Sequence, residues 1–267
     1  DGIQRVFIVD ADQVGRINPY YKKHVAAEIN KLGRNHPFIR TQFFCEEIDA
    51  QAGMFNAARL ALMQGDQPGS STAVPGLIYA FLLDVAGQDE ARLAGDLTAP
   101  LTNPGRDSVS LTIASIDMSS IELLQAPTYR FVNRQQWVGQ NHTMIFGKFK
   151  SLVESWKPQH IVIDATGVGE GLWAMLDNAF PDRVIAVKFS QKTKSEIGWR
   201  YIAIIETGRA RDCTRTATSG SGALCLPHEG QTPTYDKVLA QYVACQSEIL
   251  PGSAKTLRWG VPEGARG

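Results

Sequence analysis

The sequence has 267 residues, of which 43% are hydrophobic and 20% are charged. This is the composition of a folded globular domain, and it excludes a disordered chain, a collagen-like fibre and a coiled coil. Lys plus Arg and Asp plus Glu each number 27, so the chain has no overall basic excess that would indicate nucleic-acid binding. The apolar runs are too short to predict a membrane-spanning helix.

The first 66 residues have the pattern of a small α/β segment. A short apolar strand is predicted over residues 6–9 and a second strand over residues 37–45. Between them, Asn18 and Pro19 are typical of a helix start, and Gly33 would close that helix after Leu32. A short helix is predicted over residues 54–63. The stretch QGDQPGSSTAVP at residues 64–75 is rich in Gly, Pro and Ser, which predicts a flexible connector over residues 67–75.

The remainder, residues 76–267, predicts one larger domain. Strands are expected at 77–84, 108–116, 129–138, 161–164, 184–187 and 256–260. Helices are expected from about His142 to Pro158 and over residues 169–180, 195–208 and 235–250. Three strands in succession followed by alternating helices and strands indicate an α/β fold, with a mixed sheet flanked by helices. The stretch from 89 to 107 lacks a clear period, and a loop of that length is usually functional or disordered.

Two aspartates follow hydrophobic strands in matched positions. Asp84 ends YAFLLD, and Asp164 ends HIVID. If these strands are parallel neighbours, the two carboxylates stand side by side and need a cation between them to stay ionised. Mg²⁺ or Mn²⁺ is the expected cation, because both prefer oxygen ligands. The alternative for either residue is a structural helix cap or Asx-turn.

The turn after Asp164 is rich in glycine. Gly167, Gly169 and Gly171 have the spacing G-x-G-x-G, which differs from the dinucleotide-binding G-x-G-x-x-G, and no P-loop motif is present. These glycines either let a sugar-phosphate backbone approach the following helix or only make a tight turn. Residues 183–215 carry eight basic and three acidic side chains. This stretch suits phosphate contacts or a solvated helix face.

Four segments in order closely resemble the nuclease region of tailed-bacteriophage terminase large subunits. They are YAFLLDVAGQDEA, NPGRDSVSLTI, HIVIDATGVGEGLWAML and SQKTKSEIGWRYIAIIETGR. The earlier stretch HPFIRTQFFCEEIDAQAGMF resembles the family's segment between the packaging ATPase and the nuclease. The resemblance therefore implies that residues 1–66 are a linker from the end of the ATPase region and that residues 76–267 are a ribonuclease H-like nuclease domain.

The resemblance also implies an activity and its partners. The family suggests a Mg²⁺- or Mn²⁺-dependent endonuclease that cuts concatemeric double-stranded DNA by two-metal phosphodiester hydrolysis during viral genome packaging. Asp84 matches the family's first-strand aspartate and Asp164 its second acidic motif, so both are expected to be catalytic metal ligands. Lys192, Lys194 and Arg209 are expected to contact DNA.

The implied partners are double-stranded DNA, the terminase ATPase domain of the full-length chain, the portal protein and the terminase small subunit. No membrane partner is expected, and the implied location is the cytoplasm of the infected bacterial host. The family's third acid opens a helix after the last strand and is expected beyond Gly267, so that the end of the nuclease domain would be missing from this sequence.

Two alternatives remain open from the sequence. An ATP-binding protein of the actin or sugar-kinase type would use DATGVGEG as a phosphate loop, although such a protein needs two similar halves. The chain would otherwise be a DNA-binding module that is inactive without its third acid.

Overall fold

The computed structural model describes residues 8–46, 53–85, 108–213, 234–250 and 255–262. Its centre is a six-stranded sheet in the order β5-β4-β1-β2-β3-β6, and a separate two-stranded hairpin pairs β7 with β8. The strands are β1 (Ile78–Asp84), β2 (Ser108–Asp117), β3 (Thr128–Val138), β4 (His160–Asp164), β5 (Val184–Val187), β6 (Ala210–Asp212), β7 (Gln246–Ile249) and β8 (Leu257–Gly260). The helices are α1 (Ala11–Ile17), α2 (Pro19–Leu32), α3 (Pro37–Phe43), α4 (Ala57–Leu62), α6 (Ile121–Leu124), α7 (His142–Trp156), α8 (Gly169–Ala179), α9 (Gln191–Glu206) and α10 (Thr234–Ala244).

The strand directions bring the carboxyl ends of most strands to one edge of the sheet. Strand β2 is antiparallel to both β1 and β3, whereas β4 and β5 run parallel to β1, and β6 runs parallel to β3. The carboxyl ends of β1, β3, β4, β5 and β6 therefore point the same way. We call this side of the sheet the carboxyl edge and the opposite side the amino edge. The predicted mixed α/β sheet is confirmed.

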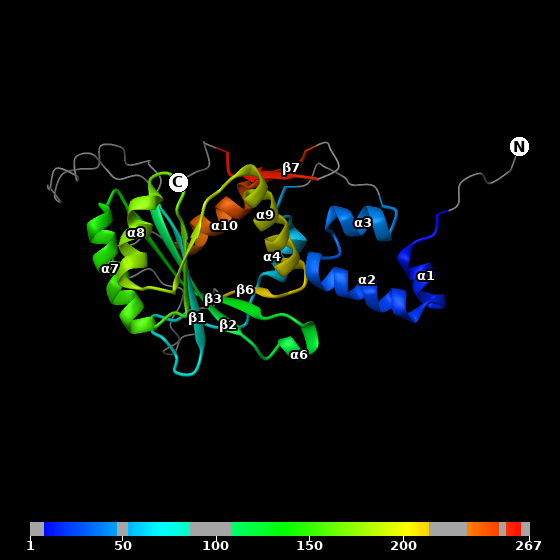
Figure 1. Ribbon diagram of the computed structural model, residues 1–267, viewed down its shortest axis with the longest axis horizontal. Helices are drawn as coiled ribbons and strands as arrows, with labels where there is room; N and C mark the ends of the chain where they lie inside the picture. The colour runs from blue at the N-terminus through cyan, green and yellow to red at the C-terminus, as the bar shows by residue number, and fades with distance from the viewer. Residues whose placement is uncertain (1–7, 47–52, 86–107, 214–233, 251–254, 263–267) are drawn as a thin grey trace, which may run out of the picture.

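Helices cover both faces of the sheet. Helices α7 and α8 lie on the first face, and α4, α9 and α10 lie on the second (Figure 1). On the first face, the ring centroids of Phe81 and Phe149 lie 5.4 Å apart, and those of Tyr79 and Trp156 lie 5.0 Å apart. Both ring pairs meet edge to face, the geometry that aromatic quadrupoles favour. The odd-numbered residues of β1 thus belong to the first core, and its even-numbered residues project from the second face.

The second core joins parts of the chain that are distant in sequence. Met54, Phe131 and Ile205 are buried in it. The β7–β8 hairpin packs against α9, where the indole nitrogen of Trp259 donates to the carbonyl oxygen of Lys194 at 2.8 Å and the backbone amide of Leu257 donates to the Ser195 hydroxyl at 2.8 Å. These bonds fix the hairpin on the first half of α9.

Residues Pro37–Phe43 form helix α3, and the strand predicted over residues 37–45 is wrong. Pro37 occupies the first turn of α3, and the His36 ring nitrogen Nδ1 accepts a hydrogen bond from the Phe38 amide at 3.1 Å. A first-turn proline with a side-chain cap is a helix-start signal. The buried Ile39 and the aromatic Phe43 are four residues apart and therefore lie on the same face of this helix.

Other elements agree with the prediction, and some differ in their bounds. Strands β1 to β5, β8 and helices α2, α7 and α8 lie where they were expected. Helix α9 starts earlier, because Ser190 and Thr193 form a reciprocal capping box. Helix α10 ends at Ala244, so the helix predicted over residues 235–250 is wrong at its end, where β7 lies, and neither β6 nor β7 is predicted. Both are short, so neither has a clear alternating pattern.

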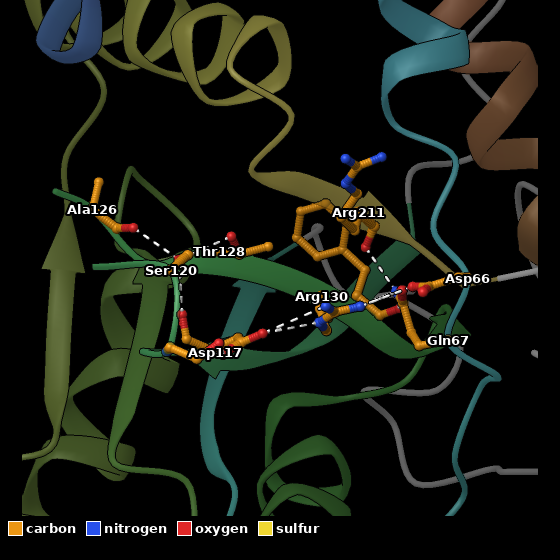
Figure 2. A network of polar contacts seen from close by, with 10 residues as sticks. Asp66, Gln67, Asp117, Ser120, Ala126, Thr128, Arg130 and Arg211 are labelled. Carbon is orange, nitrogen blue, oxygen red and sulfur yellow. Dashed lines mark hydrogen bonds and ion pairs between the residues drawn. The ribbon is translucent and has the colours of Figure 1, made fainter. Parts of the chain in front are cut away.

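The stretch after α4 is bonded to the sheet at the amino edge. Arg130 of β3 lies between Asp117, at the end of β2, and Asp66, whose Oδ1 accepts from Arg130 at 3.0 Å (Figure 2). Gln67 donates to the carbonyl oxygen of Arg211 at 3.0 Å. Further along, the Ser70 amide donates to the carbonyl oxygen of Val132 at 2.8 Å. This polar network belongs to the connector, and it lies at the opposite edge from Asp84.

Several expectations concern residues that the structure does not describe. The predicted strand at 6–9 falls mostly on such residues, and residues 8 and 9 are in no helix or strand. The loop over 89–107 lies wholly outside the described residues. The division of the chain at residues 66 and 76 stays a prediction. Within the described ranges, no helix is both long and apolar enough to cross a membrane.

Candidate active site

Asp84 and Asp164 end two neighbouring parallel strands. In the β1–β4 pair, Leu83 lies opposite Ile163, so the next residues along the two strands are the two aspartates. Neighbouring strands are about 4.8 Å apart, and residues in register project from the same face. Leu83 and Ile163 are buried in the first core. Both aspartates therefore project from the second face at the carboxyl edge, where Asp84 is exposed and Asp164 is half-buried.

The turn after Asp164 is built by its own side chain and by two glycines. The Asp164 oxygen Oδ1 accepts from the Thr166 amide at 2.8 Å, so the Asx-turn considered for this residue is present. Gly167 has a φ of 58°, which favours glycine. At Gly169, a Cβ atom would overlap the carbonyl oxygen of Asp164. A carboxylate has up to four acceptor sites, so this turn still leaves Asp164 able to bind a ligand.

A second hydrogen bond joins this turn to the start of α9. The Thr166 hydroxyl oxygen accepts from the Phe189 amide at 2.9 Å. On the surface nearby, Lys188 and Glu170 form an ion pair with an N–O distance of 2.9 Å, and this contact lowers the pKa of Glu170. Both side chains are more than half exposed, so the pair contributes little stability. The turn is thus positioned from both sides, by α8 and by the β5–α9 connection.

Two adjacent carboxylates are chemically suited to a divalent cation. Their charges repel each other unless a cation or a proton lies between them, and carboxylate oxygens are the ligands that Mg²⁺ and Mn²⁺ prefer. Asp84 and Asp164 would hold such an ion. Within the described part of the chain, no group of three or more His, Cys, Asp and Glu side chains is placed to hold a metal. The described residues thus offer two protein ligands of a site that would need further ones.

Lys192 and Lys194 lie in the first turn of α9, which begins beside the Asp164 turn. Lys192 is exposed. The Nζ atom of Lys194 lies 4.9 Å from the centre of the Trp259 ring, a distance within the range of a cation–π contact. The hairpin therefore orients Lys194, whereas Lys192 points its charge into solvent.

Arg209 has an internal position. Its relative exposure is 7%, its Nε donates to the Thr207 hydroxyl at 2.9 Å, and its guanidinium donates to the carbonyl oxygen of Pro127 at 3.4 Å. Burial lowers the pKa of this guanidinium. Its donors serve the turn between α9 and β6, and a contact of Arg209 with DNA stays a prediction.

Two residues that lie beside the aspartates are not predicted as site residues from the sequence. Ser110 of β2 lies directly opposite Asp84, and Gln136 of β3 lies opposite Ser110. In the sequence, Ser110 alternates with the apolar Val109 and Leu111, which marks it as the polar side of its strand. Gln136, in contrast, follows a polar run and has no such pattern. The pairing register, which places them next to Asp84, is not visible there.

Comparisons with known proteins agree with this arrangement. The family model described as "Terminase RNaseH-like domain" matches residues 117–219. No curated protein sequence matches the chain. Among solved structures, the magnesium-bound large terminase nuclease from thermophilic phage G20c is similar over 81% of this chain and 92% of its own, with 13% identity and a TM-score of 0.51. The cobalt-bound form of that nuclease is similar over 80% and 90%, also with 13% identity and a TM-score of 0.51.

These findings define a fold and a family resemblance. The fold is that of a ribonuclease H-like nuclease, with a mixed sheet between two helical layers. Residues 117–219 match the family model of the terminase RNaseH-like domain, which confirms the resemblance to bacteriophage terminase large subunits drawn from the sequence. The matched range includes Asp164 and both lysines of α9, whereas Asp84 lies before it.

Proposed function

We propose that this chain is the nuclease region of a DNA-packaging terminase and that it cuts concatemeric double-stranded DNA. The observation that carries the proposal is the alignment of Asp84 and Asp164 at the ends of two parallel strands, on one face of a terminase-type fold. If both aspartates only stabilised turns, their strands would not need to be parallel neighbours with the two side chains on one face.

Each aspartate has a role in this proposal. Asp84 and Asp164 hold the divalent cations and are the catalytic residues. When bound, a pair of Mg²⁺ or Mn²⁺ ions would polarise the phosphodiester and activate a water for two-metal hydrolysis. The chain's own task is to keep both carboxylates ionised, adjacent and facing the substrate. The Thr166 and Gly169 contacts serve this task at Asp164.

Lys192 and Lys194 are the proposed contacts to the DNA backbone. Both lie at the start of α9, whose connection to β5 is bonded to the Asp164 turn through Thr166. Lysine side chains bind phosphates without reading sequence, which suits cutting with little sequence preference.

The partners follow from the proposed role. They are double-stranded DNA, the ATPase domain of the full-length polypeptide, the portal protein and the terminase small subunit, all within the cytoplasm of an infected bacterium. Residues 1–66 would be the link to the ATPase domain, residues 67–75 a connector, and residues 76–267 the nuclease domain. Contacts of α2 and α4 with α9 support a fixed attachment of this link to the nuclease.

Plasmid cleavage tests the proposal. The chain is incubated with supercoiled plasmid in Mn²⁺ or Mg²⁺, and Asp84→Asn and Asp164→Asn are compared with wild type. We expect metal-dependent nicking that chelation stops and that either substitution abolishes. Full cutting by either variant would remove that residue from the active site. A wild-type chain that binds DNA without cutting it would favour the DNA-binding module instead.

A further inference from the structure

The polar row that contains the two aspartates continues across the sheet. Asp84 is paired with Ser110, and Ser110 is paired with Gln136. Directly paired residues in neighbouring strands project from the same face, so Asp164, Asp84, Ser110 and Gln136 form one line over β4, β1, β2 and β3. We call this line the transverse row. It spans three strand spacings of about 4.8 Å, or roughly 14 Å.

The transverse row is open, whereas the sheet beside it is covered. Asp84 is exposed, and the other three members of the row are half-buried. Towards the amino edge on the same face, Ala114 and Phe131 are paired with each other and are buried in the second core, with exposures of 2% and 6%. The helical cover of α9 and α10 therefore ends before the transverse row, which leaves a polar ledge at the carboxyl edge.

The groups that continue the row beyond the carboxylates are neutral hydrogen-bonding groups. Among the described residues, the side-chain hydroxyl of Ser110 has no hydrogen-bond partner. The Gln136 amide donates to the Ser108 hydroxyl, and this bond orients the Gln136 side chain. The nearest cation on β3, Arg134, is held by both oxygens of Asp212 at 2.7 and 2.9 Å. Its charge is thus already paired.

Neutral donors are well suited to this position. A Lys or Arg directly opposite Asp84 would form an ion pair with it and would compete with a cation for the carboxylate. A serine hydroxyl can donate to a phosphate oxygen while Asp84 keeps its charge, and hydroxyl and amide side chains commonly contact the nucleic-acid backbone.

We propose that Ser110 is a substrate-positioning residue whose hydroxyl donates to a phosphate oxygen of the DNA strand that is cut. The strand would then lie along the transverse row, from the aspartates over Ser110 towards Gln136. This inference rests on the proposed nuclease function and adds to it the direction of the bound strand. The alternative is that Ser110 is only a solvated residue of a half-open strand.

A pair of substitutions of equal shape isolates the hydroxyl. Ser110→Thr keeps a hydroxyl, Ser110→Val replaces it by a methyl group, and both β-branched residues suit a strand. Ser151→Ala, on the exposed side of α7 and over the other face, is the control. Each variant of the 267-residue chain is assayed for plasmid cleavage in Mn²⁺ and for binding of a short fluorescein-labelled duplex in Ca²⁺. Circular dichroism melting checks that each variant is folded.

We expect Ser110→Val to raise KM about tenfold, the loss of one hydrogen bond to a charged group, and to weaken duplex binding by a similar factor. Ser110→Thr and Ser151→Ala should match wild type, and kcat should change by less than about twofold. Wild-type KM and binding in Ser110→Val, while Asp84→Asn is inactive, would overturn this inference and leave the nuclease assignment intact. A loss confined to kcat, shared by Val and Thr, would also overturn it. A wild-type chain that neither binds nor cuts DNA would overturn both.

Discussion

Gly169 is the residue on which the position of Asp164 depends most directly. Helix α8 begins at Gly169, where the chain passes so close to the carbonyl oxygen of Asp164 that a side chain would collide with it. Gly171 lies two residues further along the same helix, and a Cβ atom there would meet nothing within 4 Å. Both glycines belong to the same glycine-rich motif, but only Gly169 is required by a close backbone contact.

Substituting each of these glycines by alanine separates the two roles. Gly169→Ala should lower the free energy of unfolding by roughly 1–3 kcal/mol, the usual cost of overpacking, and should also reduce cleavage because Asp164 is displaced. Gly171→Ala should raise stability by about 0.5–1 kcal/mol, since alanine favours a helix interior. Urea unfolding of both variants measures these differences. Equal effects of the two substitutions would mean that the contact at Gly169 does not constrain the turn.

At the scale of elements, helices α2 and α3 lie beside α9, and the rings of His36 and Trp199 are in contact there. We call this contact the aromatic joint. The ring centroids of His36 and Trp199 lie 5.0 Å apart, and His36 also caps α3 by accepting from Phe38. Burial lowers the pKa of His36, and the nearby Glu206 only partly opposes this effect. The carboxylate of Glu206 is itself paired with Arg59 of α4 at 2.7 Å. The joint therefore favours a neutral imidazole.

This joint predicts a pH dependence of stability. Because the folded pKa of His36 is lowered, the unfolded chain binds the proton more readily, and stability should fall as the pH drops below about 6.5 towards the folded pKa. His36→Asn removes the titration but keeps a capping side chain. The melting temperature should therefore decline less in His36→Asn than in wild type between about pH 7.5 and about pH 5.5. Parallel curves for the two proteins would contradict a titrating role of His36.

The sequence predicts long elements with a strong period and not those that depend on tertiary contacts. Strands β1 to β5 and helix α7 lie where hydrophobic periodicity and capping residues predict them. Strand β6 has three residues, and its pairing with β3 is a long-range contact that leaves no local pattern. At α3 the run of apolar residues predicts a strand, although Pro37 is a helix-start signal.

The residues of the candidate site are likewise only partly predictable from the sequence. Asp84 and Asp164 are recognisable because each ends an apolar strand, and the structure meets the condition that their strands are parallel neighbours. Ser110 required the pairing register, which only the folded sheet supplies. The burial of Arg209 could not be predicted from its basic surroundings in the sequence, since its position depends on a turn packed against Pro127.

At the scale of the whole molecule, the sheet brings together residues from segments that are far apart in the chain. The first core and the second core fix the two faces independently, and the carboxyl edge between them carries Asp84, Asp164 and the start of α9. Parallel pairing of β1 with β4 is thus what makes one site from two strand ends. The proposed function requires that these two carboxylates act as one cation site.

Mn²⁺ binding followed by electron paramagnetic resonance tests this claim most directly, because it needs neither DNA nor turnover. Asp182→Asn is the matched control, since Asp182 is exposed in the turn before β5, at the amino edge, and its φ of 63° also suits asparagine. We predict saturable Mn²⁺ binding by wild type and Asp182→Asn, weakened at least about tenfold by either Asp84→Asn or Asp164→Asn. Wild-type affinity in either of these two variants would contradict a shared site.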